Sequence, residues 1–328
     1  MENRGDEIQP RSAASEWVRG GGRLEWIDVA RGIGIIAVVA GHVWTRGPLR
    51  DAVYSFHMPL FFLLSGFLSR PQPPARFAIR QLASQMRPYA AFLILLIIAD
   101  SIIEPSKGNS PIFDQWPQDL APVLLGGSWL RGPFTIFWFV PCLMASRIIF
   151  NALSAHWPNP LDQRWALAII PALVGAYLLG EVAQVSILGL LTVPMALVLL
   201  WVGAAWQRIP WRRWMWVPLA AFSLAGLTAV LPTLNMKAAD YGLPLLSIAS
   251  AIATTLLLFR LSVRIAPFGG WLAAMGRASL VIMYLHVAVI HYLSPLFAKP
   301  WLLLHALVLP IAIYHVLRTS RWGRRIFL

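Results

Sequence analysis

The chain has 328 residues, of which 58% are hydrophobic and only 12% are charged, and its formal net charge is +13. An average soluble domain carries about 25% charged residues. The composition therefore excludes an ordinary soluble protein and predicts an all-α polytopic protein whose main partner is the lipid bilayer.

Residues 1–23 combine four arginines with acids, glycines and serines and lack an apolar core. We expect them to form a cytoplasmic N-terminal tail. Residues 24–328 carry apolar runs along their whole length, which predicts a single ten-helix membrane domain. The single cysteine, Cys142, lies in one of these runs and is expected to be a small buried apolar residue.

Ten apolar segments are long enough, or nearly so, to cross a bilayer as helices. The second is expected to be helical despite Pro59, because membrane helices tolerate proline. The predicted segments are 26–45, 52–69, 88–104, 133–151, 165–180, 185–206, 214–232, 243–260, 276–294 and 299–318.

The basic residues are distributed unevenly between the two sides that these segments define. Of the 27 lysines and arginines, 19 fall in the tail, the C-terminus and alternate loops, and six fall in the opposite loops. This is the positive-inside pattern, and it predicts that both termini lie in the cytoplasm. Because the pattern also accounts for the net charge, we expect no nucleic-acid partner.

The first segment carries three ionisable side chains, which are costly in hydrocarbon and therefore indicate function. Arg31 and His42 are 11 residues apart, so they share one helix face at ~16 Å separation along the axis. Asp28 precedes Arg31 by three residues and can pair with it. With a cytoplasmic N-terminus, Arg31 lies near the inner side and His42 near the outer side.

The second segment returns toward the cytoplasm and places further polar groups at the same two depths. We expect His57 near His42, and Ser65 with Gly66 near Arg31. An arginine suits a phosphate group, glycine lets a ligand approach the backbone, and a histidine can accept a proton near neutral pH. A proton pathway uses the same residue types and stays an alternative at this stage.

These residues match motifs of a known family. The motifs are D-x-x-R-G-I from Asp28, His42 after ten further residues, FHMPLFFLLSGF from Phe56, FWFVP at Phe137–Pro141 and GRASLVIMYLH at Gly276–His286. The chain resembles the integral-membrane acyltransferase-3 family. Its FWFVP motif and its length are similar to the sugar O-acetyltransferase branch, which includes fucose 4-O-acetyltransferases.

The resemblance implies transfer of an acyl group from cytoplasmic acyl-CoA to a hydroxyl of a glycan or lipid-linked sugar. The donor is expected to be acetyl-CoA, and the location a bacterial inner membrane. The expected catalytic residues are His42, Arg31 and Asp28, with His42 either a base or a transient acyl carrier. The expected residues for binding substrate or CoA are Arg31, His57, Ser65, Gly66, Phe67, Trp138, Tyr284 and His286.

Several alternatives remain at the level of sequence. A transporter of protons, sugars or lipids is expected to show paired repeats with broken helices, and we find no such repeats. A non-enzymatic scaffold does not require Arg31 and His42 on one face. No His-x-x-x-His or Glu-x-x-His spacing occurs, so we expect no metal. Assembly as a homo-oligomer is left open.

Overall fold

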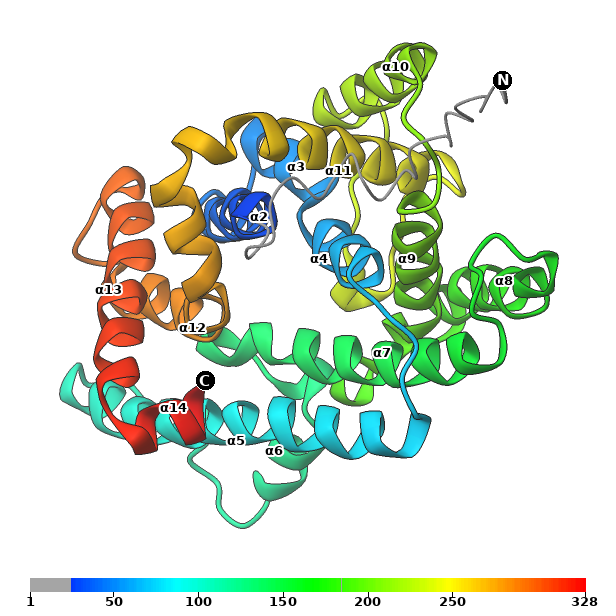
Figure 1. The fold of residues 1–328 in the computed structure, drawn as a ribbon. Coiled ribbons are helices and arrows are strands. Elements are labelled where there is room, and N and C mark those ends of the chain that lie inside the picture. The colour runs from blue at the N-terminus through cyan, green and yellow to red at the C-terminus, as the bar shows by residue number, and fades with distance from the viewer. Residues whose placement is uncertain (1–24, 184) are drawn as a thin grey trace, which may run out of the picture.

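The computed structural model describes residues 25–183 and 185–328, and the predicted N-terminal tail lies outside them. The described residues form an all-α bundle (Figure 1). The helices are α2 (Glu25–Val43), α3 (Pro48–Tyr54), α4 (His57–Phe67), α5 (Pro74–Ser106), α6 (Leu120–Leu125), α7 (Phe139–His156), α8 (Ala166–Val182), α9 (Val193–Trp206), α10 (Trp216–Leu227), α11 (Leu246–Ile265), α12 (Gly270–Leu293), α13 (Lys299–Thr319) and α14 (Arg321–Phe327). Short 3₁₀ turns include η2 (Gly132–Trp138) and η6 (Met236–Ala238).

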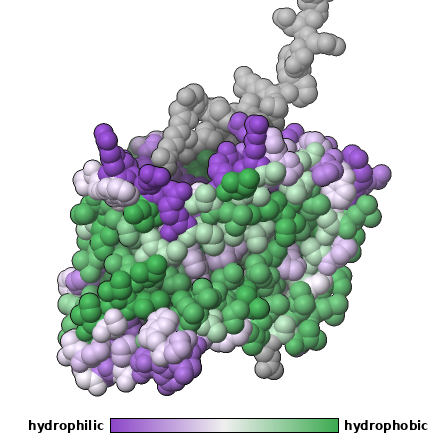
Figure 2. Space-filling view, turned by 90° about the horizontal axis from the view of Figure 1, so that it is seen from below, coloured by the Kyte–Doolittle hydropathy of each residue, from purple (hydrophilic) through white to green (hydrophobic). Residues whose placement is uncertain are grey.

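Eight helical stretches among the described residues are long and apolar enough to cross a membrane, which confirms a polytopic membrane protein. They correspond to eight of the ten predicted segments. Figure 2 shows a broad apolar band with hydrophilic residues along both of its borders. A surface of this kind matches a bilayer, because lipid tails favour apolar side chains and the interfaces favour polar ones.

The two other predicted segments form shorter helices. Segment 52–69 is not one continuous helix, because the chain breaks at Ser55 and Phe56 between α3 and α4. Pro59 explains the break: it has no N–H to donate to the carbonyl of Ser55, and its ring crowds that position. Segment 214–232 contains the 12-residue α10, which at 1.5 Å per residue covers only about 18 Å.

Helix α2 lies at the centre of the bundle. Fourteen of its 19 residues are buried, whereas only Ile169 and Ala176 are buried in α8 at the periphery. Figure 1 shows α2 enclosed by other helices, with α8 and α13 on the outside. The acidic residues Glu25 and Asp28 occupy the first turn of α2 and His42 the last, an order that suits the helix dipole.

Two glycines let α2 and α12 approach to backbone contact. Gly32 of α2 faces the carbonyl oxygen of Leu272 in α12, and Gly276 of α12 faces that of Asp28 in α2. A Cβ atom at either glycine would collide with the facing oxygen. Small residues at helix interfaces are the usual means of close packing in membranes, so α2 and α12 form a fixed unit.

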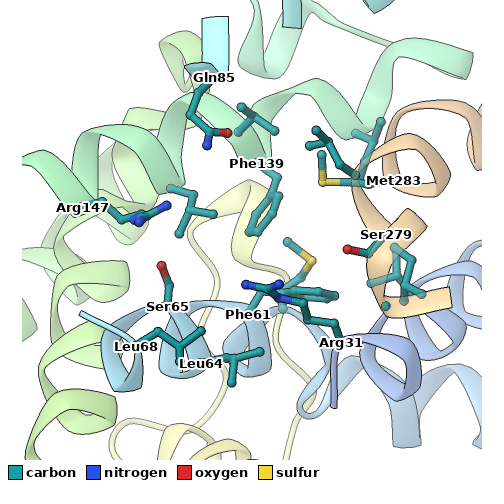
Figure 3. A pocket seen from close by; sticks show the side chains of 18 of the residues that line it. Arg31, Phe61, Leu64, Ser65, Leu68, Gln85, Phe139, Arg147, Ser279 and Met283 are labelled. Atoms are coloured by element: carbon teal, nitrogen blue, oxygen red, sulfur yellow. The ribbon is translucent and has the colours of Figure 1, made fainter. Parts of the chain in front are cut away.

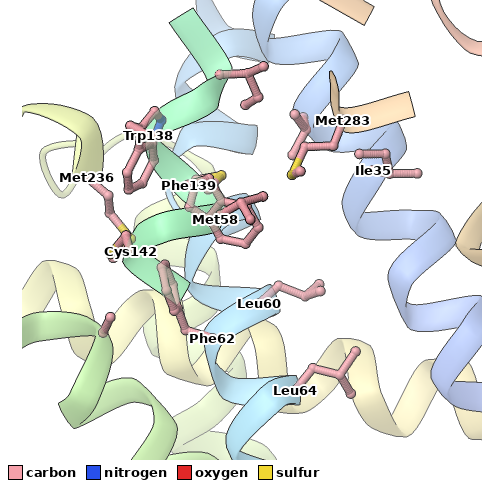
Figure 4. Packing of buried hydrophobic residues seen from close by; sticks show 14 of the residues in the cluster. Ile35, Met58, Leu60, Phe62, Leu64, Trp138, Phe139, Cys142, Met236 and Met283 are labelled. Atoms are coloured by element: carbon pink, nitrogen blue, oxygen red, sulfur yellow. The ribbon is translucent and has the colours of Figure 1, made fainter. Parts of the chain in front are cut away.

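Aromatic and aliphatic side chains fill the space between α4 and α7 (Figure 4). Phe62 of α4 meets Phe139 of α7 edge to face, with ring centroids 5.3 Å apart. Cys142 is buried beside them and is a free thiol. This layer holds α4 and α7 at the distance that leaves an opening between α7 and α2.

Candidate active site

A cavity of about 300 Å³ lies between α2, α4, α7 and α12. Its polar lining side chains gather around one part of the wall, and its remaining lining is apolar. Figure 3 shows Arg31, Ser65 and Arg147 pointing toward the same opening. The polar lining residues are Arg31, Ser65, Gln85, Arg147, Arg277 and Ser279.

The wall of this cavity is cationic. Its lining residues include three arginines from three helices, Arg31, Arg147 and Arg277, and no acidic residue. The charged neighbours of Arg147 are Arg31 and Arg80, both of the same sign. Arginines held together in a half-buried space attract an anion, and a planar guanidinium is matched to phosphate oxygens.

One buried carboxylate stands directly behind two of the arginines. Asp28 is 1% exposed, and its oxygens lie 3.6 Å from Arg31 and 4.0 Å from Arg277. The close packing of Gly276 on Asp28 brings the neighbouring Arg277 into this position. Because one carboxylate offsets only part of three positive charges, the cavity keeps a net positive wall.

The lining residues of α2 follow one helix face. Arg31, Ile35 and Val38 line the cavity, and the next position on this face is His42. The cavity therefore reaches along the predicted Arg31–His42 face, but its lining ends at Val38, one turn before His42. The cavity therefore does not form a continuous passage from Arg31 to His42.

The same order occurs on the two other helices that approach His42. On α12 the lining ends at Met283, three residues before His286, and on α4 it ends at Met58, directly after His57. Three histidines thus lie just beyond the apolar end of the cavity. Val38, Met58 and Met283 stand between them and the arginines.

The structure brings His42 into contact with His286. Their ring centroids are 5.1 Å apart, and His286 is fully buried. His57 is also buried, with its Nδ1 2.8 Å from the carbonyl oxygen of Val53 and its ring 4.7 Å from that of Tyr54. A lysine approaches from η6: Lys237 donates hydrogen bonds to the carbonyl of Leu130 and the hydroxyl of Thr135.

Four further residues expected at the site do not line this cavity. Gly66 faces the carbonyl oxygen of Leu200 in α9, so its missing side chain serves a helix contact. The others are buried aromatic residues in the core. Phe67 contacts Trp26 at 5.4 Å, Trp138 contacts Phe139 at 5.9 Å, and Tyr284 stacks on Phe92 at 4.8 Å.

A separate polar cluster joins α5 to α12. Asp100, Glu104 and His291 place potential metal-ligating atoms within 4.8 Å of one another. The carboxylate of Asp100 accepts hydrogen bonds from the Tyr292 hydroxyl and the Ile112 amide. These bonds tie the segment that follows α5 to α12. Sequence spacing did not reveal the cluster, because its members come from helices far apart in the chain.

Sequence reasoning also missed Arg147, Arg277, Gln85 and Ser279 as lining residues. Arg147 did carry a signal, since an arginine within a membrane segment is a functional candidate by itself. Arg277 lies at the very start of the predicted segment 276–294, whereas in the structure it lies inside α12, which begins six residues earlier. No local pattern marks Gln85 or Ser279.

The bundle and its cationic cavity define a polytopic membrane protein able to hold an anionic ligand beside a cluster of histidines. The family model described as an acyltransferase domain, that of the acyltransferase 3 family, matches residues 24–317, and the chain belongs to this family. It is therefore a membrane acyltransferase. Comparison with curated proteins and with solved structures found no match.

Proposed function

We propose that the protein transfers an acetyl group from cytoplasmic acetyl-CoA to a hydroxyl of a glycan or lipid-linked sugar at a bacterial inner membrane. The observation that carries the proposal is the cavity itself. Three arginines at its polar part suit the phosphates of a CoA donor, and its apolar part points toward His42. The match to the acyltransferase family supports the acyl chemistry.

The size of the cavity supports binding of part of the donor. A volume of about 300 Å³ is at the small end for sites that enclose a whole ligand. The pantetheine arm with its thioester fits such a space, while the nucleotide stays at the arginines. Because the basic loops are expected on the cytoplasmic side, the donor enters there.

The thioester must then pass the apolar end of the cavity. Met58 and Met283 are 7% exposed and stand with Val38 before the histidines. Methionine side chains are unbranched and flexible, so we propose that these two move aside when the arm enters. This step brings the acyl carbon within reach of His42.

The residue roles follow from these positions. Arg31 binds a donor phosphate, Asp28 orients Arg31, and Ser65 donates a hydrogen bond to the donor. His42 takes the proton of the acceptor hydroxyl, or carries the acyl group briefly; the geometry is compatible with both. His57, held by Val53, orients the acceptor. The sugar O-acetyltransferase branch is favoured by the motif around Trp138, which packs beside the cavity-lining Phe139.

The test combines chemistry in cells and in vitro. Mass spectrometry of surface and secreted glycans, with and without the gene, is expected to show the loss of one acetyl mass. Membranes that contain the protein are expected to move label from acetyl-CoA to the glycan fraction. Uptake of sugar or protons into proteoliposomes without any acyl donor, with no acyl transfer, would instead support a transporter.

A further inference from the structure

Four histidines of the described chain make the same local contact. In each, the ring Nδ1 lies within hydrogen-bond distance of the carbonyl oxygen four residues earlier. A carbonyl only accepts hydrogen bonds, so in the neutral ring Nδ1 carries the proton and Nε2 keeps a lone pair. The four are His57, His156, His286 and His305.

His286 differs from the other three in what surrounds its Nε2. This atom is buried and has no hydrogen-bond partner among the described residues. Leaving a buried acceptor unpaired is unfavourable, and such atoms in native proteins call for a functional explanation. The Nδ1 of the same ring lies 2.9 Å from the carbonyl oxygens of both Ile282 and Met283. These two contacts hold the ring in one orientation.

The ring that faces His286 is that of His42. Their centroids are 5.1 Å apart and the planes are inclined by 60°. A centroid separation of 5.1 Å is short enough for a ring N–H of the half-buried His42 to donate a hydrogen bond to the Nε2 of His286. The backbone contact between Gly276 and Asp28 fixes α2 against α12, so the two rings stay paired.

We propose that His286 is a positioning residue whose Nε2 accepts a hydrogen bond from His42. This inference rests on the proposed function, since it assigns His42 the proton transfer. One nitrogen of His42 donates to His286, so the other nitrogen is left with a lone pair that faces the acceptor hydroxyl. His286 would thus orient the base His42, as a third group orients the base in many active sites.

The proton and electron balance is complete without a further reactant. The acceptor hydroxyl gives its proton to His42, and its oxygen attacks the thioester carbonyl carbon. The new C–O bond forms and the C–S bond breaks. The thiolate of CoA leaves and takes the proton from His42. While His42 is protonated, the lone pair of His286 stabilises it.

A neutral imidazole suits this position better than a carboxylate. Val281, Ile282, Leu285 and Val287, close to His286 on α12, are buried apolar residues. A buried carboxylate in such surroundings needs a permanent cationic partner, because an unpaired charge is strongly unfavourable there. His286 stays neutral, and its Nε2 accepts the hydrogen bond from His42 both before and after His42 takes up the proton.

Two substitutions separate this role from packing. His286→Asn keeps a donor near Nδ1 but removes Nε2, whereas His286→Gln places an amide oxygen near the position of Nε2. Purified protein in nanodiscs is assayed for acetyl transfer, with donor binding measured in parallel by titration. We expect His286→Asn to lower kcat about 10- to 100-fold, the worth of one hydrogen bond to a charged group, with the KM for acetyl-CoA unchanged. His286→Gln is expected to recover part of the loss.

The matched control is His305→Asn. His305 makes the same Nδ1 contact, with the carbonyl of Trp301, on the peripheral helix α13, and this variant is expected to keep full activity. A His286→Asn variant with wild-type kcat would overturn the inference and leave the proposed function intact. Equal losses in the Asn and Gln variants, together with lost donor binding, would assign His286 to packing. A wild-type protein without transfer activity would remove the proposed function and this inference together.

Discussion

The imidazole rings of His42 and His286 meet at a centroid distance of 5.1 Å, although the two residues lie near opposite ends of the chain. Helix packing alone creates the contact, because α2 and α12 touch through Gly32 and Gly276. The pair lies one turn beyond the cavity whose wall contains Arg31. The proposed proton transfer and the proposed donor binding therefore lie at separate places on the same two helices.

His42→Ala is the first prediction. Removal of the imidazole is expected to abolish acyl transfer, because general-base catalysis alone is worth about 10²- to 10⁴-fold. Since the cavity lining ends at Val38, acetyl-CoA affinity is expected to stay unchanged. Transfer to the glycan fraction and donor affinity are measured on the same membranes. Transfer retained by a correctly inserted His42→Ala protein would exclude the residue from the mechanism.

Arg147→Gln tests the cationic wall. Arg147 faces the cavity with Arg31 as its neighbour, so its loss is expected to weaken donor binding about 10- to 100-fold, as for one charge-assisted hydrogen bond. The effect is expected with acetyl-CoA and not with acetyl-pantetheine, which has no phosphate. Titration of both donors provides the measurement.

The control for Arg147 is Arg212→Gln. Arg212 is an exposed arginine in the connection between α9 and α10, and its loss is expected to leave donor binding unchanged. If Arg147→Gln weakens the two donors equally, the residue does not recognise phosphate.

Lys237 gives a prediction on pH. Burial lowers the pKa of Lys237 from 10.5 to about 8, so between pH 8 and 10.5 the folded protein binds fewer protons than the unfolded chain. Stability therefore rises with pH in this window, because the unfolded state is the one that holds more protons. Because Lys237 is partly exposed, solvent screening reduces this gain in the free energy of unfolding to about 1 kcal/mol.

Thermal unfolding of the wild type and of Lys237→Met, at pH 7.5 and pH 10, measures this contribution. The wild type is expected to gain stability relative to the variant as the pH rises. A difference in Tm that is the same at both pH values would show that Lys237 keeps an ordinary pKa.

The sequence was sufficient for eight of the ten predicted spans and for the cluster of Arg31 with Ser65, because apolar runs and helix depth depend only on local order. It also contained the reason for the break between α3 and α4, since Pro59 cannot donate to Ser55. The contribution of Arg147 to the cavity was not predictable in this way. It depends on how the fold places α7 across the cavity from α2, and such an arrangement of distant helices leaves no periodic pattern in the chain.

Gly276→Ala tests whether close helix packing sets the site. A methyl group at Gly276 would collide with the carbonyl oxygen of Asp28, and forced overpacking costs about 1–3 kcal/mol. We expect a lower Tm and weaker donor binding, because Asp28 and Arg31 shift together. The matched control is Gly175→Ala in α8, where a Cβ meets no atom within 4 Å. Alanine favours a helix by about 1 kcal/mol over glycine, so this variant is expected to be as stable as the wild type or more stable. Thermal unfolding and donor titration are measured for both variants. If Gly276→Ala and Gly175→Ala behave alike, α2 and α12 tolerate separation, and the position of Arg31 does not depend on their contact.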